Sequence, residues 1–285
     1  ILGDVLSAAY QQSQLSIGNF SARTVSVGDL FMGAIIPGIV LVVCYALYVV
    51  LRAYLSPQMA PSQNVEIVSG RWKILLTSLL PPFVLIASVL GSILLGVATP
   101  TEAAGVGAFG AILLALSKKS LTKRNLTESV ETTTEITAMV FMILLGSSIF
   151  SLVFRGFGGD DLITSIFNQL PGGTFGAVLL VMVLIFLLGF ILDFIQITLV
   201  VVPIVGPALL MLGVDPIWLG IMIAINLQTS FLTPPFGFAL FYLRGVAPDS
   251  LATKDIYKGV IPFILIQLMV LVALAIFPEL VTALP

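Results

Sequence analysis

The sequence predicts an all-α polytopic membrane protein. Of its 285 residues 59% are apolar and only 9% are charged, and the mean hydropathy is +1.16. Soluble domains carry about a quarter charged residues. The charges form a few clusters, and the uncharged runs between them approach or exceed the ~20 residues that span a bilayer. Together these runs predict about seven to nine membrane passes or half-passes.

Composition also excludes several classes of protein. The chain has no histidine, and its single cysteine, Cys44, lies in an apolar run where a small packing residue is expected. Zinc sites, disulfides and Cys/His catalysis are therefore excluded. A net charge of −2 gives no reason to expect nucleic acid as a partner, and the basic residues near 118–124 suit lipid headgroups. The first residue is Ile1 and not Met, and no basic region precedes an apolar run, so no signal peptide is visible and we expect the chain to begin inside a longer polypeptide.

Residues 1–28 lack a membrane-length run, and we interpret them as a loop or short helix at the membrane surface. The first firm span covers 31–51, and the basic polar stretch 56–73 suits a cytoplasmic loop. The run 74–117 is too long for one span. We place its joint at Thr99 to Glu102, because Pro100 disfavours helix at the residue before it, and Thr and Glu cap a helix start.

Two polar segments follow. Residues 125–135 are interpreted as an amphipathic helix on the cytoplasmic surface, with Asn125 as its N-cap and Glu128 as the reciprocating partner. A simple polar linker is the alternative. The segment 155–174 has too many glycines to be one regular helix. Its adjacent Asp160 and Asp161 favour a solvated loop or a helix cap over a metal site.

A carboxylate lies between two apolar stretches at Asp193. Ionisable groups at membrane depth are costly, and they usually mark ion or substrate pathways. A single helix over 175–214 would be far too long for a membrane. We therefore predict either a re-entrant hairpin or two spans that meet near Asp193. An ordinary loop in the headgroup layer is the other interpretation of this carboxylate.

The uncharged run 216–243 contains Thr233-Pro234-Pro235, so its helix must be interrupted at membrane depth. Exposed carbonyls are tolerated there only inside protein or beside a water-filled cavity. Unwound carbonyls with Thr and Ser hydroxyls suit Na⁺, and a half-helix N-terminus suits an anionic substrate group. A plain proline kink repaired by Ser and Thr is the alternative, although the density of polar groups around the prolines favours a site.

Four ordered motifs resemble the large membrane subunit (DctM-like, or M subunit) of the tripartite ATP-independent periplasmic (TRAP) transporters. They are VGDLFMGAIIPG at 27–38, GVATPTEAAG at 96–105, FRGFGGDD at 154–161 and LQTSFLTPPFG at 227–237. The resemblance covers almost the whole chain. It implies a multi-pass protein of the bacterial inner membrane that is similar to elevator transporters and built of inverted repeats. This chain resembles the C-terminal half, with the second repeat.

The resemblance implies sodium-coupled import of a small organic acid. A periplasmic substrate-binding protein (P subunit) delivers the acid, and a small membrane subunit (DctQ-like) is a further partner. On this basis 29–136 holds scaffold helices and the cytoplasmic amphipathic helix, and 137–254 holds transport-domain elements. The hairpin near 175–213 and the broken helix near 216–243 lie in that second region. Residues 255–285 form a C-terminal transmembrane helix.

The resemblance also implies which residues bind the coupling ion and the substrate. Leu232 and Pro234 have only backbone carbonyls to offer, and the motif does not divide the substrate neighbours between acid and ion. The implied sodium ligands are Gly189, Asp193, Thr229, Leu232 and Pro234, and the implied substrate neighbours are Gln228, Ser230 and Thr233.

Two other classes of function compete with the transporter. An intramembrane enzyme lacks support, because no second carboxylate lies at helical spacing from Asp193 and no Gly-x-Ser-x-Gly motif is present. Composition does not distinguish a transporter from a non-transporting scaffold or a channel-like subunit. Channels favour repeated pore-lining rings, whereas this chain has interrupted helices.

Overall fold

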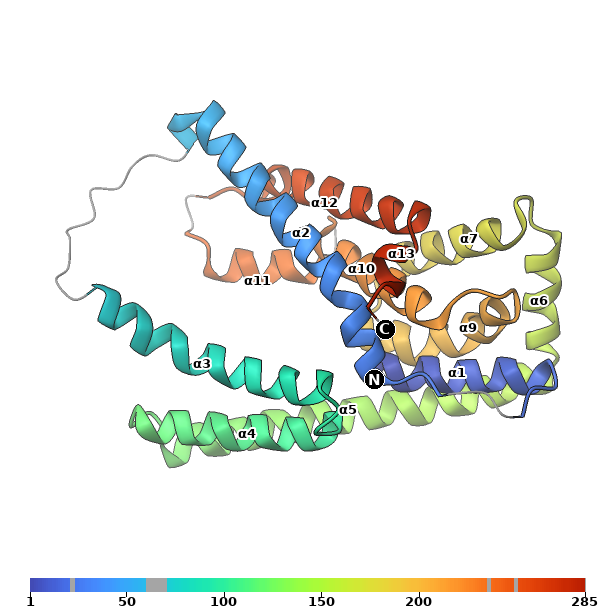
Figure 1. The fold of residues 1–285 in the computed structure, drawn as a ribbon, viewed down its shortest axis with the longest axis horizontal. Coiled ribbons are helices and arrows are strands. Elements are labelled where there is room, and N and C mark those ends of the chain that lie inside the picture. The colour runs from blue at the N-terminus through green and yellow to red at the C-terminus, as the bar shows by residue number, and fades with distance from the viewer. Residues whose placement is uncertain (21–23, 60–70, 235–236, 249–250, 285) are drawn as a thin grey trace. The chain divides into compact units, whose positions relative to one another are not determined.

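A computed structural model describes residues 1–20, 24–59, 71–234, 237–248 and 251–284. These residues form helices and no strands, which confirms the predicted all-α class (Figure 1). Among them, six helices are long and apolar enough to cross a membrane, or seven if the bent pair α6 (Gly159–Gln169) and α7 (Gly173–Leu188) is one span. The shorter apolar helix α10 (Pro216–Leu232) adds to these. A polytopic membrane protein is confirmed.

The chain divides into two compact units. One unit combines Ile1–Tyr48 with Val140–Pro285, and the other is Val49–Met139. Two helices, α2 (Val27–Leu55) and α5 (Lys123–Gly156), run from one unit into the other. The functional division into scaffold and transport elements stays a prediction.

The smaller unit contains η1 (Pro57–Met59), α3 (Arg71–Leu94) and α4 (Pro100–Ser117). The predicted joint between the two apolar segments is confirmed by a complete capping box. The Thr99 backbone N–H donates to Glu102 Oε2 at 2.8 Å, and the Glu102 N–H donates to Thr99 Oγ1 at 3.4 Å. Each group satisfies one backbone donor that a helix start leaves unpaired.

The cap predicted at Asn125 is wrong. Helix α5 begins at Lys123, and the Asn125 N–H donates to Thr122 Oγ1 at 3.1 Å. Residues 125–135 are the first part of this 34-residue helix and not a separate helix. The physical reason is that neither glycine nor proline occurs between Lys123 and Leu145, so nothing ends the helix before the apolar run begins.

The glycine-rich segment 155–174 contains helix α6, so it is more ordered than a loop. Gly158 ends the preceding turn with φ +75°, a conformation that glycine adopts without strain. Asp160 and Asp161 lie in the first turn of α6, where the helix dipole favours negative charge. Neither carboxylate caps the helix, because Gly158 is its N-cap and no side chain bonds the cap; Asp160 instead pairs with Arg155 at 3.9 Å. No group of three or more metal-ligating His, Cys, Asp or Glu side chains occurs in the part of the chain that the structure describes.

In the larger unit, α1 (Leu2–Ser16) packs along α9 (Val202–Met211) and against α10. A short helix is therefore present over 2–16, with Leu6 and Ala9 buried on its inner face, and its location at the membrane surface stays a prediction. Gly220 on α10 makes the close approach possible. A Cβ at this position would lie 2.7 Å from Leu6 Cδ1 and 2.6 Å from Leu30 Cδ2.

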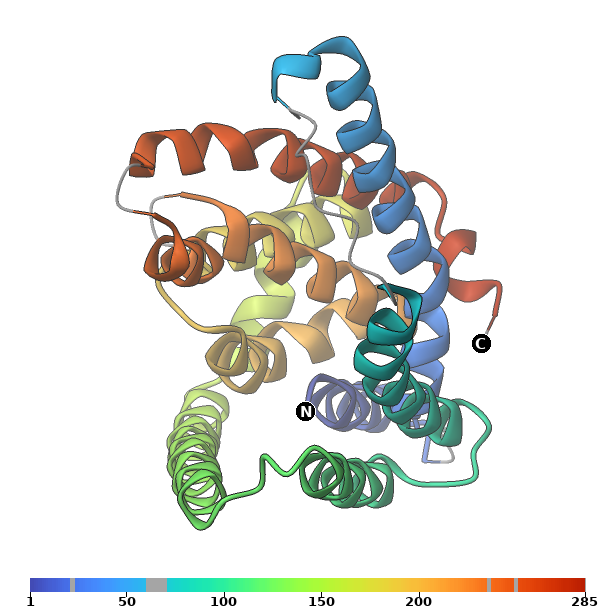
Figure 2. The same cartoon turned by 90° about the vertical axis from the view of Figure 1, so that its left-hand side faces the viewer.

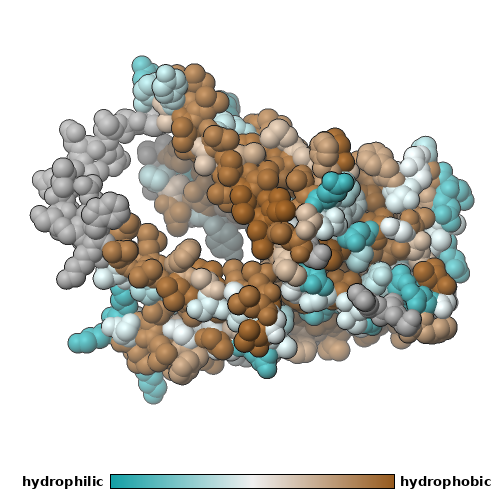
Figure 3. Space-filling model, viewed as in Figure 1, coloured by the Kyte–Doolittle hydropathy of each residue, from teal (hydrophilic) through white to brown (hydrophobic). Residues whose placement is uncertain are grey.

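The C-terminal helices complete this core. Helix α12 (Thr253–Ile276) lies alongside α10 in both views (Figures 1 and 2), and the Trp218 indole N–H donates to the Leu274 carbonyl at 2.8 Å. The short helix α13 (Glu279–Thr282) packs near the start of α2, where the position of a Cβ on Gly33 lies 3.2 Å from the Val281 carbonyl. Apolar residues dominate the surface in Figure 3, as a protein surrounded by lipid requires.

Candidate functional site

The segment 173–211 forms a hairpin with two apolar arms. The first arm is α7, and the second runs through α8 (Phe194–Gln196), the π-helix η2 (Ile197–Val201) and α9. At the open end of the hairpin, the Thr174 hydroxyl donates to the Leu212 carbonyl at 3.4 Å. Because the first residues of one arm meet the last residues of the other, the arms are antiparallel. The hairpin connection is residues 189–193.

Asp193 begins the second arm of the hairpin. Its Oδ1 accepts the Phe194 N–H at 2.7 Å, and its own N–H donates to Gln196 Oε1 at 3.1 Å. The predicted carboxylate is therefore a helix N-cap as well as a candidate ligand. The side chain also accepts the backbone N–H of Gln196, which completes a capping box, and it is half-buried. The hairpin connection therefore ends in a partly exposed carboxylate, the kind of ligand that a cation prefers.

The predicted break in the apolar run 216–243 is confirmed. Helix α10 ends at Leu232, Thr233 is extended with φ −90° and ψ 124°, and helix α11 (Phe238–Val246) begins after Gly237. Pro235, the second proline of the motif, lies outside the described residues. Around the break the Thr233 N–H donates to the Ser230 carbonyl at 3.1 Å, and its hydroxyl donates to the Thr229 carbonyl at 2.8 Å.

Two buried hydroxyls precede the break. Thr229 Oγ1 donates to the Ile225 carbonyl at 2.7 Å, and Ser230 Oγ donates to the Leu227 carbonyl at 2.8 Å. Both side chains are fully buried. A hydroxyl that donates its proton to the backbone keeps its lone pairs for an acceptor role, and these lone pairs suit a cation.

The hairpin connection packs directly against the broken helix. A Cβ on Gly189 would lie only 2.6 Å from Ser230 Cβ, so no larger residue fits without movement. Next to this contact, the Phe194 and Phe231 rings have centroids 5.9 Å apart. The structure thus brings Gly189 and the first turn after Asp193 against 230–231, although they are about forty residues apart in sequence.

Helix α11 returns to the end of α10. A Cβ on Gly237 would lie 2.7 Å from the Phe231 carbonyl oxygen and 3.1 Å from that of Thr233. Only glycine permits the backbone to approach so closely. The carbonyl end of one half-helix and the amide end of the next therefore meet at the break, close to Leu232 and Pro234.

A cavity of about 480 Å³ adjoins the break and the second hairpin arm. Gln228 and Leu232 line it, whereas Ser230 faces Gly189 and the Thr233 hydroxyl is bonded to its own helix. The eight predicted site residues therefore lie around the junction of hairpin and broken helix, but they do not all face one space. The residues that line the cavity are Ile1, Leu2, Phe194, Thr198, Ala224, Leu227, Gln228, Phe231, Leu232 and Ala239.

Two residues of this region were missed by the sequence interpretation. Thr198 is only 2% exposed and lines the cavity from the π-helix. Asn226 is 1% exposed, and its Nδ2 donates to the Met182 carbonyl at 2.7 Å, which fastens α10 to the first hairpin arm. The signal for both was present, since a polar residue inside an apolar membrane run requires a partner.

The comparisons with known proteins agree with this architecture. The sequence matches the family described as "Tripartite ATP-independent periplasmic transporter, DctM component" over residues 15–280. The sialic acid TRAP transporter large permease protein SiaM of Vibrio cholerae serotype O1 is 30% identical over 267 residues, which are 91% of this chain and 60% of the relative.

Two further relatives are similarly distant. The ectoine TRAP transporter large permease protein TeaC of Halomonas elongata is 28% identical over 258 residues, with 89% of this chain and 58% of the relative covered. The C4-dicarboxylate TRAP transporter large permease protein DctM of Vibrio cholerae serotype O1 is 28% identical over 292 residues, 93% of this chain and 62% of the relative. The chain spans about three fifths of these relatives, all of them transporter permeases and not enzymes. It belongs to the DctM family of large TRAP transporter permeases, multi-pass proteins of the bacterial inner membrane.

Proposed function

We propose that this chain is part of a sodium-coupled secondary transporter that imports a small organic acid. The observation that carries the proposal is the packing of the hairpin connection, at Gly189, onto Ser230 beside the helix break. Secondary transporters bind substrate and coupling ion where discontinuous helices meet at membrane depth. The ion is cargo here, moving with the acid.

The sodium site draws on both elements. Asp193 contributes a carboxylate oxygen from the hairpin, and Thr229 contributes its buried hydroxyl oxygen. Carbonyls at Leu232 and Pro234, at the end of α10, add neutral oxygens, and Gly189 lets the hairpin approach them. A hard cation such as Na⁺ prefers oxygen ligands, and a single carboxylate matches its single charge.

The substrate site adjoins this ion site. Ala239, in the first turn of α11, lines the same cavity as Gln228. The first backbone N–H groups of a helix have no partner within the helix, and its dipole favours an anion. We therefore assign a carboxylate group of the substrate to the start of α11, with Gln228 as a neighbouring donor and Ser230 and Thr233 as supports of the break.

Movement and partners complete the proposal. Binding of sodium draws the hairpin and broken helix together, the acid completes the site, and the two elements move as one body in an elevator mechanism. The substrate reaches the complex on a periplasmic binding protein, and a small membrane subunit accompanies the permease. Support comes from the family, and relatives are named for sialic acid, ectoine and C4-dicarboxylates.

The test is uptake into proteoliposomes that contain the full-length permease, its small subunit and its binding protein. An inward sodium gradient is compared with an equal potassium gradient, for the wild type and for Asp193→Asn. We expect saturable uptake with sodium only, and its loss in the variant. Uptake that ignores sodium would refute the coupling ion. Unsaturable flux would instead favour a channel-like subunit.

A further inference from the structure

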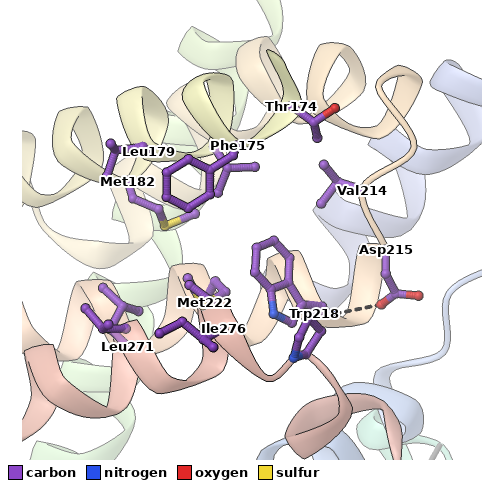
Figure 4. Close-up of a pocket in the computed structure, with 14 residues that line it drawn as sticks. Thr174, Phe175, Leu179, Met182, Val214, Asp215, Trp218, Met222, Leu271 and Ile276 are labelled. Atoms are coloured by element: carbon purple, nitrogen blue, oxygen red, sulfur yellow. Dashed lines mark hydrogen bonds between the residues drawn. The ribbon is translucent and has the colours of Figure 1, made fainter. Parts of the chain in front are cut away.

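An apolar groove separate from the candidate site lies between α7, α10 and α12. Its volume is about 610 Å³. Figure 4 shows Phe175, Leu179 and Met182 of α7 above Trp218 and Met222 of α10, with Ile276 of α12 closing the lower side. The floor is fixed, because the Trp218 indole N–H is bonded to the Leu274 carbonyl at 2.8 Å.

The rim of this groove is apolar. The side chains of Phe175, Leu179, Val272 and Ile276 are 52–64% exposed around its mouth. A groove that opened to water would expose these side chains at a cost of roughly 25 cal/mol for each Å². An apolar mouth on a membrane protein therefore opens toward hydrocarbon.

The groove lies at the end of the larger unit away from the cytoplasm. Phe263 of α12 packs against Tyr45 and Tyr48 of α2, at 5.2 and 5.3 Å between ring centroids, and the chain just beyond α12 packs near Gly33. The start of α12 lies toward the Tyr48 end of α2, and it carries the basic residues Lys254 and Lys258. Positive charge marks the cytoplasmic side, so Ile276 and the groove face the other leaflet.

The groove ends in one acidic residue. Among the described residues that line it, Asp215 is the only charged one, and Thr174 lies across from it (Figure 4). Asp215 Oδ1 caps α10 by accepting the Trp218 N–H at 2.8 Å. Its exposed carboxylate gives this end of the groove a negative charge. Such an end attracts an ammonium group and repels a headgroup with a net negative charge.

We propose that the groove binds one acyl chain of an amine-bearing phospholipid from the leaflet opposite the cytoplasm. The acyl chain lies on Trp218 and Met222, and the headgroup ammonium lies beside Asp215. The apolar lining, the apolar mouth and the single acid at the membrane-surface end all match this molecule. A helix of another polypeptide is the competing occupant, and cross-linking from position 179 distinguishes the two.

The probe is phosphatidylethanolamine with a photoreactive group on one acyl chain, in nanodiscs that hold the full-length permease complex. After irradiation, labelled peptides are identified by mass spectrometry. We expect labels on α7 and α12 near the groove. Ala275→Trp fills the groove and should lower this labelling about tenfold, a change that corresponds to ~1.4 kcal/mol. Ala273→Trp, two residues away and outside the groove lining, is the matched control and should label like the wild type.

A second variant with its own control keeps the test decisive if Ala275→Trp fails to fold. Leu179→Trp narrows the groove at its exposed rim, and Leu265→Trp is the control on α12 outside the lining, 59% exposed against 52% for Leu179. The headgroup is tested with Asp215→Asn, which keeps the helix cap but removes the charge. Unlabelled phosphatidylethanolamine should compete roughly fivefold better than phosphatidylglycerol in the wild type, and equally well in the variant.

Three results would overturn the proposal. Equal labelling of the groove-filling variants and their controls would mean that the labelled lipid is bulk bilayer lipid and does not occupy the groove. Equal competition by the two lipids in the wild type would remove the role of Asp215. A photoreactive amino acid at position 179 that cross-links to polypeptide and not to lipid would show that a protein segment covers the groove.

Discussion

Two spans of similar apolar character have opposite environments in this molecule. In the span Phe194–Met211 of the hairpin, 67% of the residues are buried inside the protein, whereas in Leu75–Leu94 of α3 none is. Hydropathy alone does not distinguish them. The difference lies in the interruptions and the polar residues, since the hairpin arm begins at Asp193 and contacts a helix that carries Asn226, Thr229 and Ser230.

The comparison teaches that burial follows interruptions and polar partners in this chain. Close glycine contacts occur in both regions, since Gly189 approaches Ser230 and Gly110 of α4 approaches Leu85 of α3. Substitutions should therefore have large effects in the hairpin and the broken helix, and small effects on the exposed side of α3.

The largest effect is expected from Asp193. Asp193→Asn keeps an N-cap side chain but loses the negative charge. We expect sodium-driven uptake to fall roughly 100-fold, because removal of a charged ligand costs about 2–3 kcal/mol. Initial uptake rates at saturating substrate measure the change. Uptake within twofold of the wild type would remove this residue from the ion site.

Next comes Gly189→Ala. The added Cβ would lie 2.6 Å from Ser230 Cβ, so the hairpin must move away from the break. Overpacking of this kind costs about 1–3 kcal/mol, and the Tm in detergent should fall with it. Gly259→Ala on α12 is the control, because its Cβ meets nothing within 4 Å. Equal Tm values for the two variants would contradict the close approach.

A smaller effect is expected from Asn226→Ala. The variant loses the hydrogen bond to the Met182 carbonyl, which is left buried without that donor. The Met182 carbonyl lies inside α7 and keeps its helix partner, so the cost is that of one buried hydrogen bond, about 0.5–1.5 kcal/mol. The free energy of unfolding, from denaturant titration of the detergent-solubilised protein, is the readout. Asn226→Gln keeps the amide on a longer side chain, so its free energy of unfolding should lie between those of the wild type and Asn226→Ala.

The smallest effect is expected on α3. Phe83 is 69% exposed, so Phe83→Ala removes little packed surface within this chain. Substitutions at such positions usually change stability by less than about 0.5 kcal/mol. The same Tm assay applies. A fall as large as that of Gly189→Ala would mean that another part of the assembly covers this face.

Much of this contrast was predictable from particular residues. The capping box at Thr99 and Glu102 and the break at Thr233 and Pro234 each follow from local rules, and the structure confirms both. The Asn125 cap failed because Thr122 was an equally good cap and no helix breaker followed. The Asn226 bond to Met182 was not predictable, because a sequence pattern does not say which carbonyl a polar side chain meets across forty-four residues.

The central claim is that the hairpin and the broken helix contribute to one sodium site. The most direct measurement is the sodium-induced rise in Tm of the full-length permease, for Asp193→Asn, Thr229→Val and the double variant. A bound ion stabilises the folded state by an amount that rises with the logarithm of its concentration relative to its Kd. If both side chains bind the same ion, their effects on the sodium-induced rise in Tm are coupled. The double variant should then lose about as much of this rise as Asp193→Asn alone. Losses that add fully, or a sodium response that survives in the double variant, would contradict the account.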